Sequence, residues 1–157
     1  MQETKDDATR SGEVSHKRVA LIQCTKSKRD ERSPASDLYD ESQLFRKMRS
    51  YVQAAGLEWY VLSAKVGLLP PEKNIEPYDE FGVDEQTAKS AANDLERLGV
   101  DEVEVIAGRK YTAELIPELE RRGIDVIEKC AGLSIGKRMS RLNTLISEQE
   151  NETVVQG

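Results

Sequence analysis

The chain has 157 residues, of which 38% are hydrophobic and 33% are charged, a composition that fits one globular domain with a real core. Its formal net charge is −6, which argues against a protein that coats DNA through a large basic surface. No apolar run approaches the roughly 20 residues that span a bilayer, so we expect no membrane partner and a cytoplasmic location.

Cysteine and histidine are too scarce for several classes of site. Cys24 and Cys130 cannot build a disulfide framework, and with the single histidine, His16, they supply too few ligands for a structural zinc site. We therefore expect no metal and no cofactor. His16 lies in the polar N-terminal stretch, which argues against hydrolase schemes that need an ordered histidine.

The ends of the chain differ in composition from its centre. Residues 1–17 are polar, lack the apolar core of a secretory signal, and are predicted to form a disordered leader. Residues 18–147 are predicted to form a single α/β domain. The polar residues 148–157 are predicted to be a frayed tail.

The first half of the domain contains two predicted strands and one helix. The apolar run at residues 18–24 lacks clean alternation, as expected for a strand that is covered on both faces. After a polar loop, a helical pattern begins behind Ser42 as the N-cap and stops at Gly56. The second strand, residues 58–64, leads into a turn-rich loop that starts at Gly67.

The second half repeats this alternation. A helix over residues 84–98 precedes the third strand, residues 102–107, and a helix over residues 109–122 contains Pro117, which is expected to kink or break it. The fourth strand covers residues 125–129. In the last helix, Gly132 and Gly136 surround the start, and the predicted inward stripe consists of Ile135, Met139, Leu142 and Ile146.

Alternating strands and helices predict a three-layer α/β/α sandwich around a mostly parallel sheet of about four strands, because parallel strands need long crossover connections. Strand orders 2-1-3-4 and 2-1-4-3 fit equally well. Only the second order makes the first and fourth strands neighbours, which would bring Cys24 and Cys130 close together. In either order, ligands are expected outside the carboxyl ends of the strands.

The loop after the first strand combines a thiol, hydroxyls and ammonium groups. Neighbouring lysines would favour the reactive thiolate of Cys24, and the loop could hold a phosphate. The alternative is that Cys24 is a small buried hydrophobe and that the lysines are solvated. The candidate substrate-binding residues of this loop are Thr25, Lys26, Ser27 and Lys28.

The loop after the second strand supplies further candidates. The candidate residues begin at Ser63, and Lys65 could neutralise a phosphate or transfer a proton, or simply be a surface lysine. Tyr78 could stack on a base or anchor the loop, and Asp79 could bind a ligand or cap a turn. Tyr39 is another candidate ring. Cys24, Lys65 and Asp79 are the catalytic candidates.

The start of the last helix is a candidate anion site. Free N–H groups at a helix N-terminus and the helix dipole favour an anion, and Gly136, Lys137 and Arg138 lie there. The spacing does not match the P-loop pattern GxxxxGK[ST]. The alternative is that the two glycines only let the backbone turn into the helix and bind nothing.

Four segments carry a family resemblance. They are QCTKSK at residues 23–28, DLY at 37–39, LFRKMRSY at 44–51 and LSAKVGLLPPEKNIEPYD at 62–79. Together they resemble an uncharacterised family of small α/β proteins from prokaryotes and their viruses. The chain is also distantly similar to YaaA-type peroxide-stress proteins and to the uracil-DNA-glycosylase-like group that includes archaeosine synthase. These similarities imply DNA binding and a nucleobase-modifying site, respectively, although Val66 stands where relatives are expected to have histidine.

Three functional hypotheses follow. The first is a nucleotide- or nucleic-acid-directed enzyme that modifies a base or acts on an N-glycosidic bond, with a nucleotide, nucleobase or DNA as its partner. The second is a non-catalytic DNA- or nucleotide-binding module in stress response or viral or host defence. The third is a structural partner protein, which an exposed apolar patch would favour.

Overall fold

The computed structural model describes residues 16–130 and 132–156, with side chains up to residue 151. Over these residues it is a mixed α/β fold with a five-stranded, mostly parallel sheet and five helices. The elements in chain order are β1 (Arg18–Gln23), β2 (Ser33–Pro34), α1 (Ala35–Leu38), α2 (Gln43–Ala54), β3 (Glu58–Ser63), β4 (Gly67–Leu69), β5 (Asn74–Ile75), α3 (Glu85–Arg97), β6 (Glu102–Ile106), α4 (Arg109–Arg121), β7 (Asp125–Glu128) and α5 (Ile135–Gln156).

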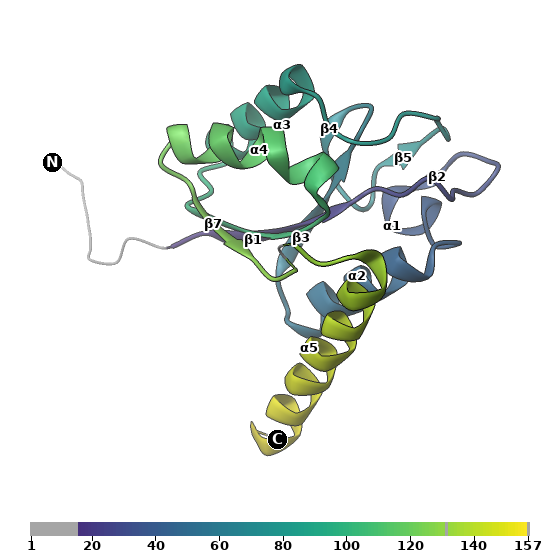
Figure 1. Cartoon of the computed structure of the whole chain (residues 1–157), viewed down its shortest axis with the longest axis vertical. Helices are drawn as coiled ribbons and strands as arrows, with labels where there is room; N and C mark the ends of the chain where they lie inside the picture. Colours follow the sequence, from purple (N-terminus) through teal and green to yellow (C-terminus); the bar gives the residue numbers. More distant parts are fainter. Residues whose placement is uncertain (1–15, 131, 157) are drawn as a thin grey trace, which may run out of the picture.

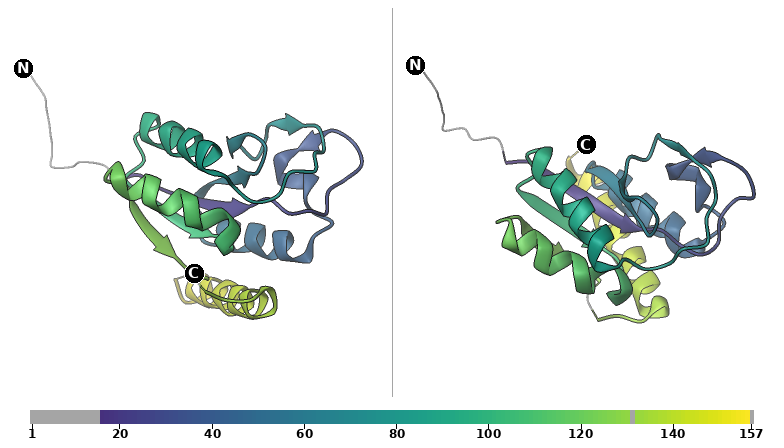
Figure 2. Two further views of the ribbon diagram at one scale, coloured as in Figure 1. Left: turned by 45° about the horizontal axis from the view of Figure 1, so that its top comes forward. Right: turned by 90° about the horizontal axis from the view of Figure 1, so that it is seen from above.

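β1 lies at the centre of the sheet, whose strand order is β4-β3-β1-β6-β7. It pairs in parallel with β3 and β6, and its consecutive side chains from Val19 to Ile22 are all buried. A strand without a solvated face needs cover on both sides. Figures 1 and 2 show α3 and α4 on one side of the sheet and α2 and α5 on the other.

The four predicted strands are confirmed to within one residue at each end. Their order is 2-1-3-4 in sequence terms, so β6 separates the strand that ends before Cys24 from the strand that ends before Cys130. A further strand, β4, was not predicted; it is short and antiparallel to β3, and its Gly67 pairs with Ser63. The reversal between them ends at Gly67, whose φ of +83° is readily adopted only by glycine.

The predicted helices are also present. The side chain of Ser42 accepts a hydrogen bond from the backbone N–H of Phe45 and thereby caps α2, as expected. Asp84 caps α3 in the same way through the N–H of Thr87. α4 runs through Pro117 without the break that the sequence suggested, and Pro117 is exposed on its outer surface.

α5 differs most from expectation. Ile135 is 57% exposed, so the predicted inward stripe is wrong at its first position, the first residue of the helix. Arg138 and Leu145 are buried instead, together with the predicted Leu142. The helix continues to Gln156, through the segment predicted to fray, and its C-terminal end projects from the body of the molecule in Figure 1.

Most of the predicted leader, residues 1–15, lies outside the described residues. The described part begins with His16 and Lys17, which lie beside the N-terminal end of β6. The His16 ring is 2.8 Å from a carboxylate oxygen of Glu102, and the Lys17 carbonyl accepts hydrogen bonds from Asp101 and Glu102. In the part of the chain that the structure describes, no helix is long and apolar enough to cross a membrane.

Candidate functional site

Five buried side chains form what we call the thiol–hydroxyl cluster, at the carboxyl ends of β1 and β3. It consists of Cys24, Tyr39, Ser63, Tyr78 and Tyr111. The Tyr78 hydroxyl is central, at 2.6 Å from the Tyr39 hydroxyl and 2.9 Å from Ser63 Oγ. The cluster therefore joins residues from three separate loops with the end of β3 and the start of α4.

Ser63 sets the direction of the hydrogen bonds in this cluster. Its Oγ accepts the backbone N–H groups of Lys65 and Val66 at 3.1 and 3.2 Å, and these bonds shape the turn into β4. A hydroxyl oxygen has two lone pairs, so the remaining Ser63 hydrogen is donated to Tyr78. Ser63 thus links the local turn to the buried tyrosines.

The tyrosines of the cluster act as neutral hydroxyls. Burial raises the pKa of Tyr39 and of Tyr111 well above the ordinary value of 10.0, and burial together with the neighbouring Cys24 does the same for the pKa of Tyr78. Removing a phenolic proton in this apolar setting would leave an unsolvated negative charge. The cluster can donate and accept hydrogen bonds at neutral pH, but it does not supply a phenolate base.

Cys24 is enclosed by backbone and tyrosine. Its side chain is 0% exposed, its Sγ accepts the N–H of Ala64 at 3.3 Å, and the Tyr111 hydroxyl is 3.2 Å from Sγ. The Tyr111 hydroxyl also lies 3.1 Å from the Cys24 carbonyl oxygen. A thiol reacts as an accessible thiolate, so this geometry places Cys24 as a wall of the site.

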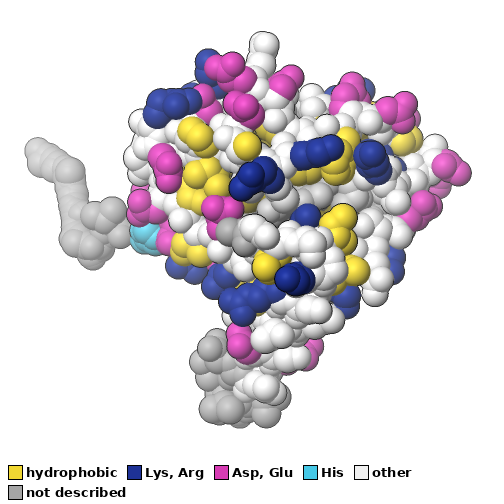
Figure 3. Space-filling model, viewed as in Figure 1, with side chains coloured by type: hydrophobic (Ala, Val, Ile, Leu, Met, Phe, Trp, Pro, Cys, Tyr) yellow, Lys and Arg dark blue, Asp and Glu magenta, His cyan; other side chains and the backbone are white. Residues whose placement is uncertain are grey.

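A second group of side chains lies above the buried cluster. We call Lys26, Lys28, Lys110, Tyr78 and Phe81 the cation–aromatic cluster. Lys28 Nζ is 4.5 Å from the centre of the Tyr78 ring, whereas Lys26 Nζ and Lys110 Nζ are 5.1 and 5.4 Å from the centre of the Phe81 ring. These distances are those of cation–π contacts. Figure 3 shows Lys and Arg side chains interleaved with hydrophobic ones on the face it displays.

The two aromatic rings of this cluster differ in accessibility. Tyr78 is buried, whereas Phe81 is 36% exposed and packs edge-on against Tyr111 with ring centres 5.4 Å apart. Burial lowers the pKa of Lys28, although the negative charges of Asp79 and Glu80 act in the opposite direction. A cavity of about 490 Å³ lies beside Phe81 and Lys110, so a ligand can reach this ring.

The first loop is held together by its own hydrogen bonds. The buried Thr25 hydroxyl donates to the carbonyl of Ser27 at 3.2 Å, and Lys28 Nζ lies 3.4 Å from the carbonyl of Lys26. Ser27 itself is exposed. Of the predicted substrate-binding residues of this loop, Lys28 lies over the rings of Tyr39 and Tyr78, whereas Lys26 lies over the ring of Phe81.

Two predicted catalytic residues lie apart from Cys24. Lys65 is exposed, and its side chain lines a different cavity of about 340 Å³ along β4 and β5. Asp79 is exposed and acts on the cluster through its charge near Lys28. Among the described residues, neither side chain contacts the buried thiol.

The start of α5 contributes in an unexpected way. Gly136 and Lys137 are exposed, whereas Arg138 is only 8% exposed. The Arg138 guanidinium donates to Gln23 Oε1 at 2.9 Å, and the same oxygen accepts the N–H of Gly108 at 2.7 Å. A Cβ on Gly108 would lie 3.0 Å from the guanidinium. Gln23 therefore joins the end of β1 to α4 and α5.

Sequence reasoning missed several residues that the structure places here. Phe81 was overlooked although an exposed aromatic two residues after Asp79 is unusual for a solvated loop. Gln23 is the one polar side chain between Val19 and Cys24, a signal of an internal hydrogen bond. Tyr111 and Lys110 follow Gly108 at the end of the third predicted strand, so the strand-end rule could have found them.

The structure provides no sign of a metal site: within residues 16–130 and 132–156, no three acidic, cysteine or histidine side chains are grouped to hold an ion. Fold and site together define an α/β protein with polar and cationic side chains gathered at the carboxyl edge of a mostly parallel sheet. The chain belongs to a family of unknown function, DUF6884, whose model matches residues 19–144. No curated protein and no solved structure matches the chain.

Proposed function

We propose that this protein binds a nucleotide or nucleic acid at the cation–aromatic cluster. The observation that carries the proposal is the gathering of three lysine ammonium groups over two aromatic rings in a chain whose net charge is −6. In an acidic protein, such a local cationic surface fits the phosphates of a ligand, and an exposed ring fits its base.

Phe81 is the stacking ring in this proposal, in place of the buried Tyr78. A base that stacks on Phe81 takes the position of an ammonium group over the ring, and the displaced Lys26 or Lys110 is then free to bind a phosphate. Lys28 stays over Tyr78, where its lowered pKa reflects partial burial. In the enzymatic form of the proposal, the exposed Asp79, whose charge acts on Lys28, orients the base or exchanges a proton.

Base modification or N-glycosidic chemistry remains the reaction class of the enzymatic form of the proposal. In it, Cys24 and the buried hydroxyls of the thiol–hydroxyl cluster form the wall behind the ligand. The full burial of Cys24 favours the alternative, a non-catalytic DNA- or nucleotide-binding module in stress response or defence. The proposal also includes a three-layer α/β/α sandwich, a cytoplasmic location, and distant similarity to YaaA-type and uracil-DNA-glycosylase-like proteins.

Binding is tested by calorimetric titration with ATP and by fluorescence anisotropy with a labelled single-stranded DNA. We expect saturable binding that weakens with salt, because phosphate contacts release counterions. Phe81→Ala should weaken binding by about 1 to 3 kcal/mol, the usual cost of one lost base stack. Leu98→Ala is the matched control, because Leu98 is also a large exposed hydrophobic side chain. It lies at the C-terminal end of α3, whereas Phe81 precedes the N-terminal end of this helix.

The lysines are tested in the same assays. Lys28→Gln and Lys110→Gln should each reduce both the affinity and its salt dependence, whereas Lys89→Gln, an exposed lysine on α3, should leave them unchanged. Absence of binding to either probe, or equal binding by Phe81→Ala and wild type, would remove the proposal. If wild type converts a bound nucleotide or DNA to a product and Asp79→Asn does not, the enzymatic form is favoured. If wild type forms no product and binding survives both Cys24→Ser and Asp79→Asn, the non-catalytic binding module is favoured.

A further inference from the structure

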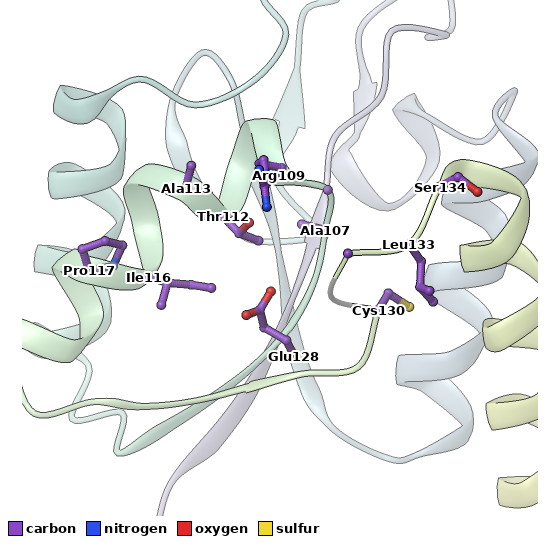
Figure 4. Close-up of a pocket in the computed structure, with 12 residues that line it drawn as sticks. Ala107, Arg109, Thr112, Ala113, Ile116, Pro117, Glu128, Cys130, Leu133 and Ser134 are labelled. Carbon is purple, nitrogen blue, oxygen red and sulfur yellow. The ribbon is translucent and has the colours of Figure 1, made fainter.

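A third cavity, of about 810 Å³, lies at the carboxyl ends of β6 and β7 (Figure 4). Its walls are the first turns of α4, the end of β7 and residues 132–134. No member of the cation–aromatic cluster lines it. Its volume falls within the range of roughly 300 to 1,000 Å³ that is usual for small-molecule sites.

The N-terminus of α4 opens into this cavity with unused donors. Gly108 is the N-cap, and it has no side chain to accept the first N–H groups of the helix. Among the described residues, the backbone N–H groups of Arg109 and Lys110 have no hydrogen-bond acceptor. Free N–H groups, the positive end of the helix dipole and the Arg109 side chain together favour an anion such as phosphate.

Thr112 provides an independent indication of a ligand. Its side chain lines the cavity one turn into α4, and the residue is only 9% exposed. No hydrogen bond joins its hydroxyl to any residue in the described part of the chain. A buried hydroxyl without a partner is costly, and a ligand atom in the cavity would satisfy it.

Glu128 faces the same cavity from the other strand. It is the last residue of β7, 20 residues after Gly108, and Figure 4 shows its carboxylate turned toward α4. No described cation forms an ion pair with it, Arg109 included. A carboxylate repels a second anion but accepts hydrogen bonds from hydroxyl groups, so this wall suits a sugar.

A similar arrangement of a helix start and an acidic residue binds ligands in known β-α-β units. In those units, phosphate binds at the N-terminus of the helix, and an acidic residue about 20 residues on, at the end of the second strand, binds ribose hydroxyls. In this chain, β6, α4 and β7 correspond to the first strand, the helix and the second strand. The chain lacks the GxGxxG pattern of dinucleotide-binding proteins. The correspondence therefore lies in the placement of one helix start and one carboxylate.

We propose that this cavity binds a phosphorylated ribose, either a free sugar phosphate or part of a nucleotide. The phosphate lies at the N-terminus of α4 against the N–H group of Arg109, with the Thr112 hydroxyl as a further donor, and the ribose hydroxyls donate to Glu128. The site stands on its own observations and does not depend on ligand binding at Phe81.

Calorimetric titration of the full chain with ribose 5-phosphate, AMP and inorganic phosphate tests the site. Wild type should bind one ribose 5-phosphate. Thr112→Val should weaken ribose 5-phosphate and inorganic phosphate alike, by about tenfold for a lost hydrogen bond to a charged group. Glu128→Gln should weaken ribose 5-phosphate by a similar factor, yet leave inorganic phosphate unchanged or tighter.

Matched controls keep the test specific. Thr144→Val and Glu114→Gln change the same side-chain types at exposed positions on α5 and α4 that do not line the cavity, so both should bind like wild type. AMP tighter than ribose 5-phosphate indicates a nucleotide, and equal affinities indicate a sugar phosphate. Thermal melts verify that each variant is folded.

Two results would overturn the proposal: no saturable binding of ribose 5-phosphate or AMP to wild type, or binding by Thr112→Val and Glu128→Gln that equals that of the controls. Phe81→Ala separates this site from the cation–aromatic cluster. It should retain full ribose 5-phosphate affinity, even if ATP and DNA binding at Phe81 fails.

Discussion

Removing the Tyr78 hydroxyl tests the thiol–hydroxyl cluster most directly. Tyr78→Phe keeps the ring, its edge contact with Tyr39 and the Lys28 ammonium above it. It removes the bonds of 2.6 and 2.9 Å to Tyr39 and Ser63, whose side chains are both 0% exposed. The substitution therefore isolates the contribution of one oxygen.

The expected loss follows from the partners that remain. Water does not reach either buried hydroxyl, so each loses a bond without replacement, at about 1 to 3 kcal/mol per unsatisfied group. Ser63 keeps its two backbone N–H donors, which places the total near the lower end, at about 2 to 4 kcal/mol. For a chain of this size the melting temperature should fall by on the order of 10 °C.

Urea unfolding and thermal melts followed by circular dichroism measure this loss. Tyr60→Phe is the control, because its hydroxyl bonds to the exposed Glu58 carboxylate at 2.8 Å and its removal should cost less than about 1 kcal/mol. If Tyr78→Phe is as stable as Tyr60→Phe, the hydroxyl cluster contributes no more than a surface bond and the reasoning fails.

Three further predictions concern backbone space, pH and thiol access. Gly108→Ala should destabilise the fold by about 1 to 2 kcal/mol, because its Cβ displaces the Arg138 guanidinium. Gly136→Ala, with open space around its Cβ, should instead stabilise α5 by about 0.5 to 1 kcal/mol. Urea unfolding measures both changes, and the reverse order of stability would contradict this prediction. Because the pKa values of the buried tyrosines are raised, the folded state retains protons that the unfolded chain loses above about pH 10. The melting temperature should therefore fall as the pH rises from 9 to 11. A constant melting temperature over this range would contradict the prediction. In a Cys130→Ala background, iodoacetamide should modify Cys24 at least about 100-fold more slowly in the folded protein than in urea, and rapid modification would restore Cys24 as a candidate nucleophile.

The sheet was predictable because its strands are short apolar runs bounded by turn residues. β1 and β6 carry consecutive buried residues, and that pattern is visible in the sequence. β4 was not predictable by the same means, since its three residues, Gly67 to Leu69, form a strand only by pairing with the end of β3. Local propensity cannot reveal a pairing that a turn brings about.

The candidate site was predictable in its loops but not in its contacts. The strand-end rule selected Cys24, Ser63 and Tyr78, which the structure does bring together. It also selected Lys65, whose side chain leaves the turn on the side of β4. Spacing along the chain identifies a loop, whereas the direction of each side chain depends on tertiary packing that one sequence does not specify.

The hydrogen bond between Gln23 and Arg138 cannot form until late in the synthesis of the chain. It joins residues 115 positions apart, and Gln23 ends the strand that is made first. At about 10 residues per second, roughly ten seconds separate the synthesis of the two partners. Until Arg138 is made, Gln23 has its partner at Gly108 but none on α5, and α5 does not yet cover its side of the sheet, so a chain truncated before Arg138 should expose apolar surface to chaperones or to aggregation.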